Sequence, residues 1–200
     1  MLLFAICFLL NISLGSVNIP VKDIVNSFSG GQASKNSWEI ILWNYRFPKA
    51  FVAILVGMGL SVSGLLMQTL FRNPLAGPDV LGLSSGASLG VAFVILGAGI
   101  VPSFLSEIFL SSYGMVLASC LGSSLVLLAV LSVSQRIRDT MSILIVGLMF
   151  GSFTNAIISV LTYFSSAEEL QKFTFWSLGS LGNQSWQNIL ILAICCFIGL

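Results

Sequence analysis

Six apolar runs occupy most of this 200-residue sequence, and none of them carries a charged residue near its centre. The hydrocarbon core of a membrane is about 30 Å thick, so a helix that spans it needs about 20 apolar residues. Charged residues make up only 8% of the chain, against about 25% in an ordinary soluble domain. Such a chain cannot cover a water-soluble globule with polar groups. The sequence therefore predicts an all-α fold, a polytopic bundle of transmembrane helices that forms one domain over residues 1–200.

The predicted spans cover about residues 1–17, 49–71, 80–101, 113–133, 141–164 and 186–200. The first run begins without basic residues and has no convincing cleavage site, which argues against a signal peptide. The last run is still apolar at Leu200, and a protein does not normally end in the middle of a bilayer. We therefore expect these residues to be a fragment of a longer protein.

The few titratable residues disfavour several classes of function. A net charge of +1 leaves no basic surface for a nucleic acid. The sequence contains no His, which removes the commonest general base and the commonest metal ligand. Its four cysteines, at positions 7, 120, 195 and 196, lie inside apolar runs without the spacing of a zinc site. We expect no metal site, no cofactor and no catalytic residue, and an intramembrane enzyme is disfavoured.

Two short helices are predicted outside the spans. A surface helix is expected at about residues 20–29, because apolar residues recur there at the spacing typical of helices that lie on a membrane. A half-helix is expected at about residues 167–179, where Ser166 and Glu169 have the spacing of a capping box. It is too short to cross a bilayer, so we expect it to dip into a vestibule covered by protein or water. The apolar residues of the surface helix are Val21, Ile24, Val25 and Phe28.

Small residues stand four apart on one face of three predicted spans. In lipid, helices associate through close backbone contact, which this spacing permits. Three such faces predict a compact multi-helix bundle. They are formed by Gly57 and Ser61 on the second span, by Gly82, Gly86 and Gly90 on the third, and by Gly147 and Gly151 on the fifth.

The most polar stretch at membrane depth lies in the fifth predicted span, at Thr154, Asn155 and Ser159. An interhelical hydrogen bond and a place on a transport pathway explain it equally well. No span holds Asp, Glu, Lys or Arg in its middle. That absence argues against a carrier driven by proton or sodium coupling.

Residues 46–90 form the most distinctive stretch of the sequence. Residues 46–90 read RFPKAFVAILVGMGLSVSGLLMQTLFRNPLAGPDVLGLSSGASLG. An Asn-Pro and a Gly-Pro turn signal predict a tight loop between the second and third spans, and we expect Asp79 to cap the next helix. By itself the pattern is explained by a stable hairpin. The polar and turn residues of this loop are Gln68, Arg72, Asn73, Pro74 and Pro78.

The string resembles the permeases of type II ABC importers, the FecCD-type proteins that take up iron-siderophores, haem and cobalamin. The R-x-P-[RK] start, the G-x-x-L-x-x-S-G-x-x-x-Q run, the R-N-P-L-A-x-P loop and the L-G-[LIV]-S-x-G-A segment match in order and spacing. Residues 140–151 and 176–179 also resemble the family, so the likeness covers essentially the whole chain.

The resemblance implies a permease that forms a homodimer or pairs with a similar subunit. Each subunit would have about ten helices, of which this chain would hold the first six. Separate ATP-binding-cassette ATPase subunits and a periplasmic substrate-binding protein are the implied partners, in the bacterial cytoplasmic membrane. The N-terminus would be cytoplasmic, although the distribution of Lys and Arg alone favours the opposite orientation. The expected cargo is an iron-siderophore-type chelate, and the alternatives are import of cobalamin or haem and a non-transporting structural subunit.

The resemblance also implies roles for individual residues. Basic residues that match Arg46 and Lys49 meet acidic residues of the binding protein in this family, where complementary charges steer docking. Snorkelling of both side chains to lipid headgroups is the alternative. Thr140, Met141 and Ser142 match the family's cytoplasmic gate, for which a plain polar turn is a nearly equal explanation. The predicted half-helix matches the family's vestibule helix.

Overall fold

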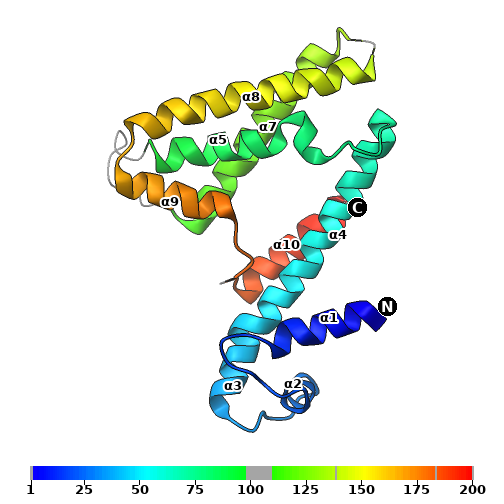
Figure 1. Cartoon of the computed structure of the whole chain (residues 1–200), viewed down its shortest axis with the longest axis vertical. Coiled ribbons are helices and arrows are strands. Elements are labelled where there is room, and N and C mark those ends of the chain that lie inside the picture. The colour runs from blue at the N-terminus through cyan, green and yellow to red at the C-terminus, as the bar shows by residue number, and fades with distance from the viewer. Residues whose placement is uncertain (1, 98–109, 138, 183, 200) are drawn as a thin grey trace. The chain divides into compact units, whose positions relative to one another are not determined.

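The computed structural model describes residues 2–97, 110–137, 139–182 and 184–199, and every regular element in these ranges is helical (Figure 1). The predicted all-α fold is therefore confirmed. The end of the third predicted span, residues 98–101, lies outside the described residues. In chain order the elements are α1 (Leu2–Ser13), α2 (Val21–Phe28), α3 (Asn36–Ile41), the π-helical turn η1 (Leu42–Arg46), α4 (Phe47–Phe71), the 3₁₀ turn η2 (Pro78–Leu81), α5 (Leu83–Ile95), α7 (Ser112–Ser134), α8 (Thr140–Phe164), α9 (Ala167–Leu178) and α10 (Trp186–Gly199).

Three described helical stretches are long and apolar enough to cross a membrane, namely Asn36–Phe71, Ser112–Ser134 and Met141–Phe164. Shorter apolar helices at Leu3–Ser13, Leu83–Ile95 and Trp186–Gly199 fall within the other three predicted spans. Helix α1 covers 12 residues and ends at Ser13, short of the predicted end at residue 17. The backbone carbonyls at that end are held by a side chain from far along the chain, as described below.

The chain divides into two compact units, Met1–Val62 with Ser180–Leu200, and Ser63–Gly179. The boundary falls inside α4. In the first unit, a core of buried apolar side chains joins α1, α2 and the start of α4. Ile12, Leu42 and Phe47 are at most 1% exposed in this core, and Ile24 of α2 is 2% exposed.

In the second unit, glycines allow α5 and α7 to approach closely. A Cβ atom added to Gly86 would lie 2.7 Å from the carbonyl oxygen of Gly122 and 2.8 Å from Val126 Cγ2. A Cβ atom on Gly90 would collide with the carbonyl oxygen of Ala118. Backbone-to-backbone contact of this kind replaces the hydrophobic driving force that helices lack in lipid.

Gly82 has a different task, because its φ of +74° lies in the left-handed region that glycine adopts without a steric penalty. It joins η2 to α5, and a Cβ atom there would lie 3.1 Å from the carbonyl oxygen of Gly147 on α8. The third and fifth predicted spans thus meet at their small residues. On α4, by contrast, a Cβ atom on Gly57 would have no neighbour within 4 Å, so no close helix contact of the kind seen at Gly86 occurs there.

Helix α9 begins with a complete capping box. The backbone N–H of Ser166 donates to Glu169 Oε2 (2.9 Å), and the backbone N–H of Glu169 donates to Ser166 Oγ (3.4 Å). This is the capping box that the sequence predicts. One turn after Glu169, Phe173 is 9% exposed and joins a core cluster with residues of α5 such as Val91.

Candidate functional site

A polar stripe runs along the described surface of α8. Residues that are three and four apart share one face of a helix, and four such positions carry hydroxyl or amide groups. The hydroxyls donate to carbonyl oxygens of their own helix at 2.9–3.0 Å, which are the distances of ordinary hydrogen bonds. They are therefore satisfied wherever the helix lies. The stripe consists of Ser152, Asn155, Ser159 and Thr162, of which the first three are exposed.

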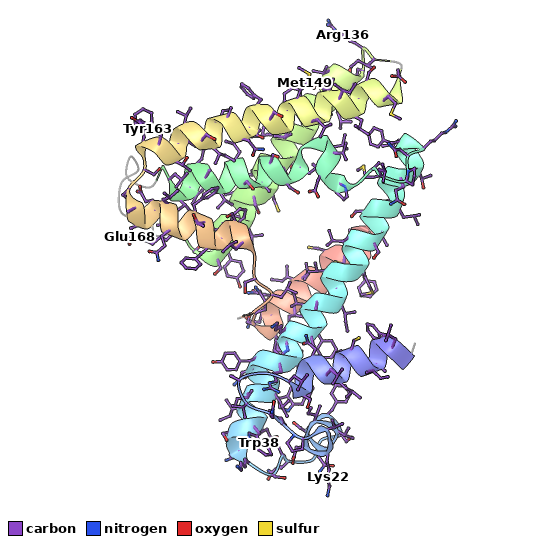
Figure 2. The ribbon with its side chains drawn as sticks, viewed as in Figure 1. Lys22, Trp38, Arg136, Met149, Tyr163 and Glu168 are labelled. Carbon is purple, nitrogen blue, oxygen red and sulfur yellow. The ribbon has the colours of Figure 1, made fainter. Side chains whose placement is uncertain are left out.

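Asn155 differs from the other members of this stripe. Its amide is exposed and makes no hydrogen bond to another described residue. An amide that faces hydrocarbon without a partner costs about 4–8 kcal/mol relative to water. An exposed amide of this kind is expected where α8 meets water or another polar group. Elsewhere on this helix large apolar side chains are exposed, among them Met149 and Tyr163 at 66% and 83% (Figure 2).

The three residues expected on the pathway are not equivalent. Thr154 is 3% exposed, and its Oγ1 donates to the carbonyl oxygen of Gly151 (2.8 Å). It therefore belongs to the interior of the second unit, while Asn155 and Ser159 lie on the outer stripe. Adjacent residues of a helix point about 100° apart, so Thr154 and Asn155 lie on different faces of α8. The sequence did not show which of the two faces is buried.

The residues of the expected gate lie at the start of α8. Asp139 is the N-cap of the helix, and its Oδ2 accepts hydrogen bonds from the backbone N–H (3.1 Å) and the hydroxyl (3.0 Å) of Ser142. The Ser142 hydroxyl, and after it the backbone N–H groups of Ser142 and Met141, lower the pKa of Asp139 below its usual value. Met141 is 51% exposed. Thr140 is the first residue of α8. Arg138 lies outside the described residues.

Arg46 holds the end of another helix. Its Nη1 donates to the carbonyl oxygens of Ile12 and Ser13, the latter at 2.9 Å, and its Nη2 donates to that of Val17. A guanidinium has five N–H groups, so two remain for another partner. A cation suits this place because the last carbonyls of α1 carry partial negative charge. Nothing in the local sequence indicated this contact, which joins residues 34 apart.

Lys49 lies one helical turn further along, on α4. It is exposed and makes no ion pair with another described residue. Of the two cations expected to dock a binding protein, Arg46 bonds α1, whereas Lys49 pairs with no other described residue of the first unit.

The loop between α4 and α5 is stabilised by its own side chains. Arg72 has a φ of +48°, and the backbone N–H of Asn73 donates to the carbonyl oxygen of Gln68 (3.2 Å), which ends α4. Asn73 Oδ1 then accepts from the backbone N–H of Leu75 (2.9 Å), as in an Asx turn. The turn residues are Asn73 and Pro74, and Pro78 opens η2.

The expected cap at Asp79 is wrong. Asp79 lies inside η2, and Gly82 occupies the N-cap position of α5 without a side-chain cap. The Asp79 carboxylate instead accepts a hydrogen bond from the hydroxyl of Ser84 in the first turn of α5. Helix α5 therefore begins at a left-handed glycine and not at a side-chain cap from Asp79.

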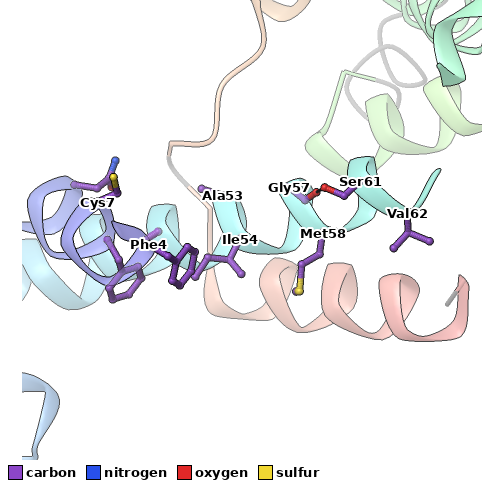
Figure 3. A pocket seen from close by; sticks show the side chains of 11 residues that line it. Phe4, Cys7, Ala53, Ile54, Gly57, Met58, Ser61 and Val62 are labelled. Atoms are coloured by element: carbon purple, nitrogen blue, oxygen red, sulfur yellow. Dashed lines mark hydrogen bonds between the residues drawn. The ribbon is translucent and has the colours of Figure 1, made fainter. Parts of the chain in front are cut away.

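The first unit contains an apolar groove of about 630 Å³ between α1 and α4. Figure 3 shows Phe4 of α1 facing Ile54 of α4, with Gly57 and Ser61 further along the same helix. The Ser61 hydroxyl donates to the carbonyl oxygen of Gly57 (2.7 Å). The groove holds no charged group. Among the described residues no three Cys, Asp or Glu side chains lie close enough to hold a metal ion.

Comparison with known proteins agrees with this arrangement of helices and motifs. The sequence pattern of the FecCD transport family matches residues 3–200. The chain belongs to the FecCD transport family. It is a multi-pass protein of the bacterial cytoplasmic membrane.

Two curated relatives in this family are permeases. The chain is 33% identical to the hemin transport system permease protein HmuU of Yersinia pestis, over 100% of this chain and 60% of that protein. It is 33% identical to the vitamin B12 import system permease protein BtuC of Escherichia coli, over 84% of this chain and 52% of that protein. The chain therefore spans only about half to three-fifths of the length of these relatives.

A solved structure shares the fold. It is described as a metal-chelate type ABC transporter in an inward-facing conformation, and it matches with a TM-score of 0.78 and 24% identity. The match covers 98% of this chain and 57% of that one. The helical order found in both units is thus the order of an ABC transporter permease fold.

Proposed function

We propose that this chain is the N-terminal part of the permease subunit of a type II ABC importer, which moves a metal chelate into the cell. The observation that carries this proposal is the polar stripe on α8, with the exposed amide of Asn155, which bonds no other described residue, at its centre. A helix that faced lipid all round would not keep such a group. A water-filled path beside α8 satisfies it.

The chemistry of the stripe suits a bulky cargo. Its hydroxyls are already bonded to backbone carbonyls, so they offer weak, replaceable contacts. No Asp, Glu, Lys or Arg lies in the middle of the Met141–Phe164 stretch, so a charged chelate meets no strong trap. A large chelate passes most easily through a path of this kind.

The proposed cargo class is a large metal chelate. An iron-siderophore complex belongs to this class, together with the hemin and vitamin B12 of the relatives' names. Haem and cobalamin fit the weakly binding stripe as well as an iron-siderophore does.

The proposed partners follow from the incomplete wall that one stripe provides. A second permease subunit, identical or similar, would supply the facing wall, and ATP-binding-cassette ATPase subunits would supply energy. The permease itself would catalyse no covalent reaction. Thr140, Met141 and Ser142, where the Asp139 cap ends the α7–α8 connection, are the proposed cytoplasmic gate.

Docking of a periplasmic binding protein is assigned to Arg46 and Lys49. Lys49 offers an exposed ammonium, and Arg46 retains two N–H groups beyond those that hold α1. Exposed charges of this kind steer association and fix its register more than they add affinity.

The test is uptake of labelled ferric siderophore, hemin and cobalamin by the source bacterium, with substitutions placed in the chromosomal gene. We expect Asn155→Leu to lower uptake of one of these chelates several-fold. Val160→Leu is the matched control, because Val160 is also exposed on α8 but points about 140° away from Asn155. Equal uptake in both variants would refute the pathway role. Loss of the gene without effect on any chelate would favour the structural-subunit alternative.

A further inference from the structure

Helix α2 presents three different faces to three different surroundings. Successive residues of a helix are about 100° apart, so its outward apolar residues fall within an arc of about 60°. A polar pair lies on one side of that arc, and the residues that touch the protein lie on the other. The apolar face is formed by Val21, Val25 and Phe28, the polar face by Lys22 and Asn26, and the protein face by Asp23, Ile24 and Ser27.

The protein face is held by polar contacts. The Asp23 carboxylate accepts hydrogen bonds from the backbone N–H (2.9 Å) and the hydroxyl (2.5 Å) of Ser34. Ser27 Oγ accepts one from Nε1 of Trp43 (3.0 Å). Asp23 and Ser27 are 7% and 1% exposed. Rolling the helix to hide its apolar face would break these buried contacts, so the roll of α2 is fixed.

The apolar face stays uncovered within the first unit. Val21, Val25 and Phe28 are 47%, 51% and 59% exposed. Rotation of α2 by about 120° around its own axis would turn this face toward the protein. On the polar face, Lys22 projects away from the ribbon (Figure 2).

The aromatic contacts of α2 fix its level relative to α4. The rings of Phe28 and Phe47 lie 5.6 Å apart, centre to centre, and Phe47 is the first residue of α4. Trp43, which bonds Ser27, also accepts a hydrogen bond through its carbonyl oxygen from Nε1 of Trp186 (3.0 Å). Tryptophans gather where a spanning helix leaves the hydrocarbon. The contacts of α2 with Trp43, and of Trp43 with Trp186, are those expected of a helix at the membrane–water boundary.

We propose that α2 is a lipid-binding interfacial helix, with Val21, Val25 and Phe28 inserted at the acyl-chain boundary and Lys22 among the phosphates. The three faces then meet protein, lipid and water in turn. Lys22 complements the negative charge of anionic phospholipids such as phosphatidylglycerol. The inference does not depend on the transport function.

A protein partner fits this face less well than lipid does. Three side chains on one short helix bury far less than the roughly 1,000 Å² that a specific protein interface needs. A bilayer needs no such area, because binding of an amphipathic helix scales with whatever apolar surface enters it. The polar neighbours Lys22 and Asn26 would have to be paired in a protein interface, but they remain hydrated at the lipid surface.

The test compares two adjacent positions. Spin labels are placed on Val25→Cys or Asn26→Cys in the full chain, after the four native cysteines are replaced by Ser, in vesicles of phosphatidylethanolamine and phosphatidylglycerol. We expect the label at 25 to collide with oxygen several-fold more often than the label at 26, and the label at 26 to collide more often with a water-soluble nickel chelate. Equal collision with the nickel chelate would place the apolar face in water and overturn the proposal. Shielding of position 25 from both reagents would show a protein cover and would also overturn it.

A second measurement keeps the native cysteines. Val25→Trp and Asn26→Trp add one fluorophore to the chain's four tryptophans, and the unmodified protein supplies the background. Brominated phospholipids should quench the added emission of Val25→Trp and leave that of Asn26→Trp largely intact. Equal quenching at both positions would contradict the assigned roll of α2.

Discussion

Adding a single methyl group at Gly86 should separate two helices of the second unit. The Cβ atom of Gly86→Ala would lie 2.7 Å from the carbonyl oxygen of Gly122, although ordinary contacts begin at 3.4 Å. Helices α5 and α7 must therefore move apart by about 0.7 Å at this point. Overpacking of this kind costs about 1–3 kcal/mol. Since backbone atoms form the obstacle, no side-chain rotation can relieve it.

Gly57→Ala is the matched control on α4, because its Cβ atom would have no neighbour within 4 Å. Both substitutions gain the same helix propensity, about 1 kcal/mol. The difference between the two variants therefore isolates the packing penalty, and we expect Gly86→Ala to be less stable by about 1–3 kcal/mol. Equilibrium unfolding by SDS in mixed micelles, followed by far-ultraviolet circular dichroism, measures both free energies. Equal unfolding midpoints would refute the close backbone contact between α5 and α7.

Three further predictions concern charged residues. Arg46→Gln should lower the free energy of unfolding by about 1–2 kcal/mol, because it removes hydrogen bonds that a charged donor makes to carbonyl oxygens at the end of α1. Lys49→Gln is the control, and it should change the free energy of unfolding by less than about 0.5 kcal/mol in the same SDS titration. Lys49→Glu should weaken binding of the periplasmic protein several-fold at low salt and less at high salt, as measured by surface plasmon resonance. Lys35→Glu on the α2–α3 connection should not weaken it. An equal loss of affinity in the two variants would contradict a docking role for Lys49. The Ser142 hydroxyl and the neighbouring N–H groups lower the pKa of Asp139 from its usual value of 3.8, so the carboxylate stabilises the start of α8 above pH 3.8 and loses this effect as pH falls through its folded pKa. Asp139→Asn should remove this residue's share of the acid destabilisation and make unfolding depend less steeply on pH below about 3.8; an unchanged acid profile would argue against the cap.

The apolar runs predicted most of the described helices because length and hydropathy are local properties of the sequence. The second, fourth and fifth predicted spans lie entirely within the helical stretches Asn36–Phe71, Ser112–Ser134 and Thr140–Phe164. The capping box of α9 was equally predictable, since Ser166 and Glu169 exchange side chain–backbone hydrogen bonds within one turn. Local chemistry of this kind needs no knowledge of distant partners.

The features that the sequence did not predict depend on contacts between distant segments or on unusual backbone conformations. Arg46 reads as an exposed cation beside a span, yet it bonds carbonyls near the end of α1. The π-helical turn Leu42–Arg46 has no Gly or Pro to mark it. Asp79 looked like a helix cap because the left-handed turn at Gly82 was not foreseen.

The candidate site was predictable only in part. Thr154, Asn155 and Ser159 were found from their polarity, but the division between a buried Thr154 and an outer stripe depends on which face of α8 meets α5 and α7. The three-sided character of α2 was hidden for the same reason. Its spacing indicated an apolar side, but only the contacts of Asp23 and Ser27 show how the helix is rolled.

Water access to Asn155 decides whether α8 lines a translocation path. Asn155→Cys and Val160→Cys are introduced into the chain with its four native cysteines replaced, and membrane vesicles are treated with a charged, water-soluble thiol reagent. If the polar stripe faces an aqueous path, we expect rapid modification at 155 and protection at 160, which points about 140° away. Protection of both positions, or equal modification of both, would contradict a translocation path along α8.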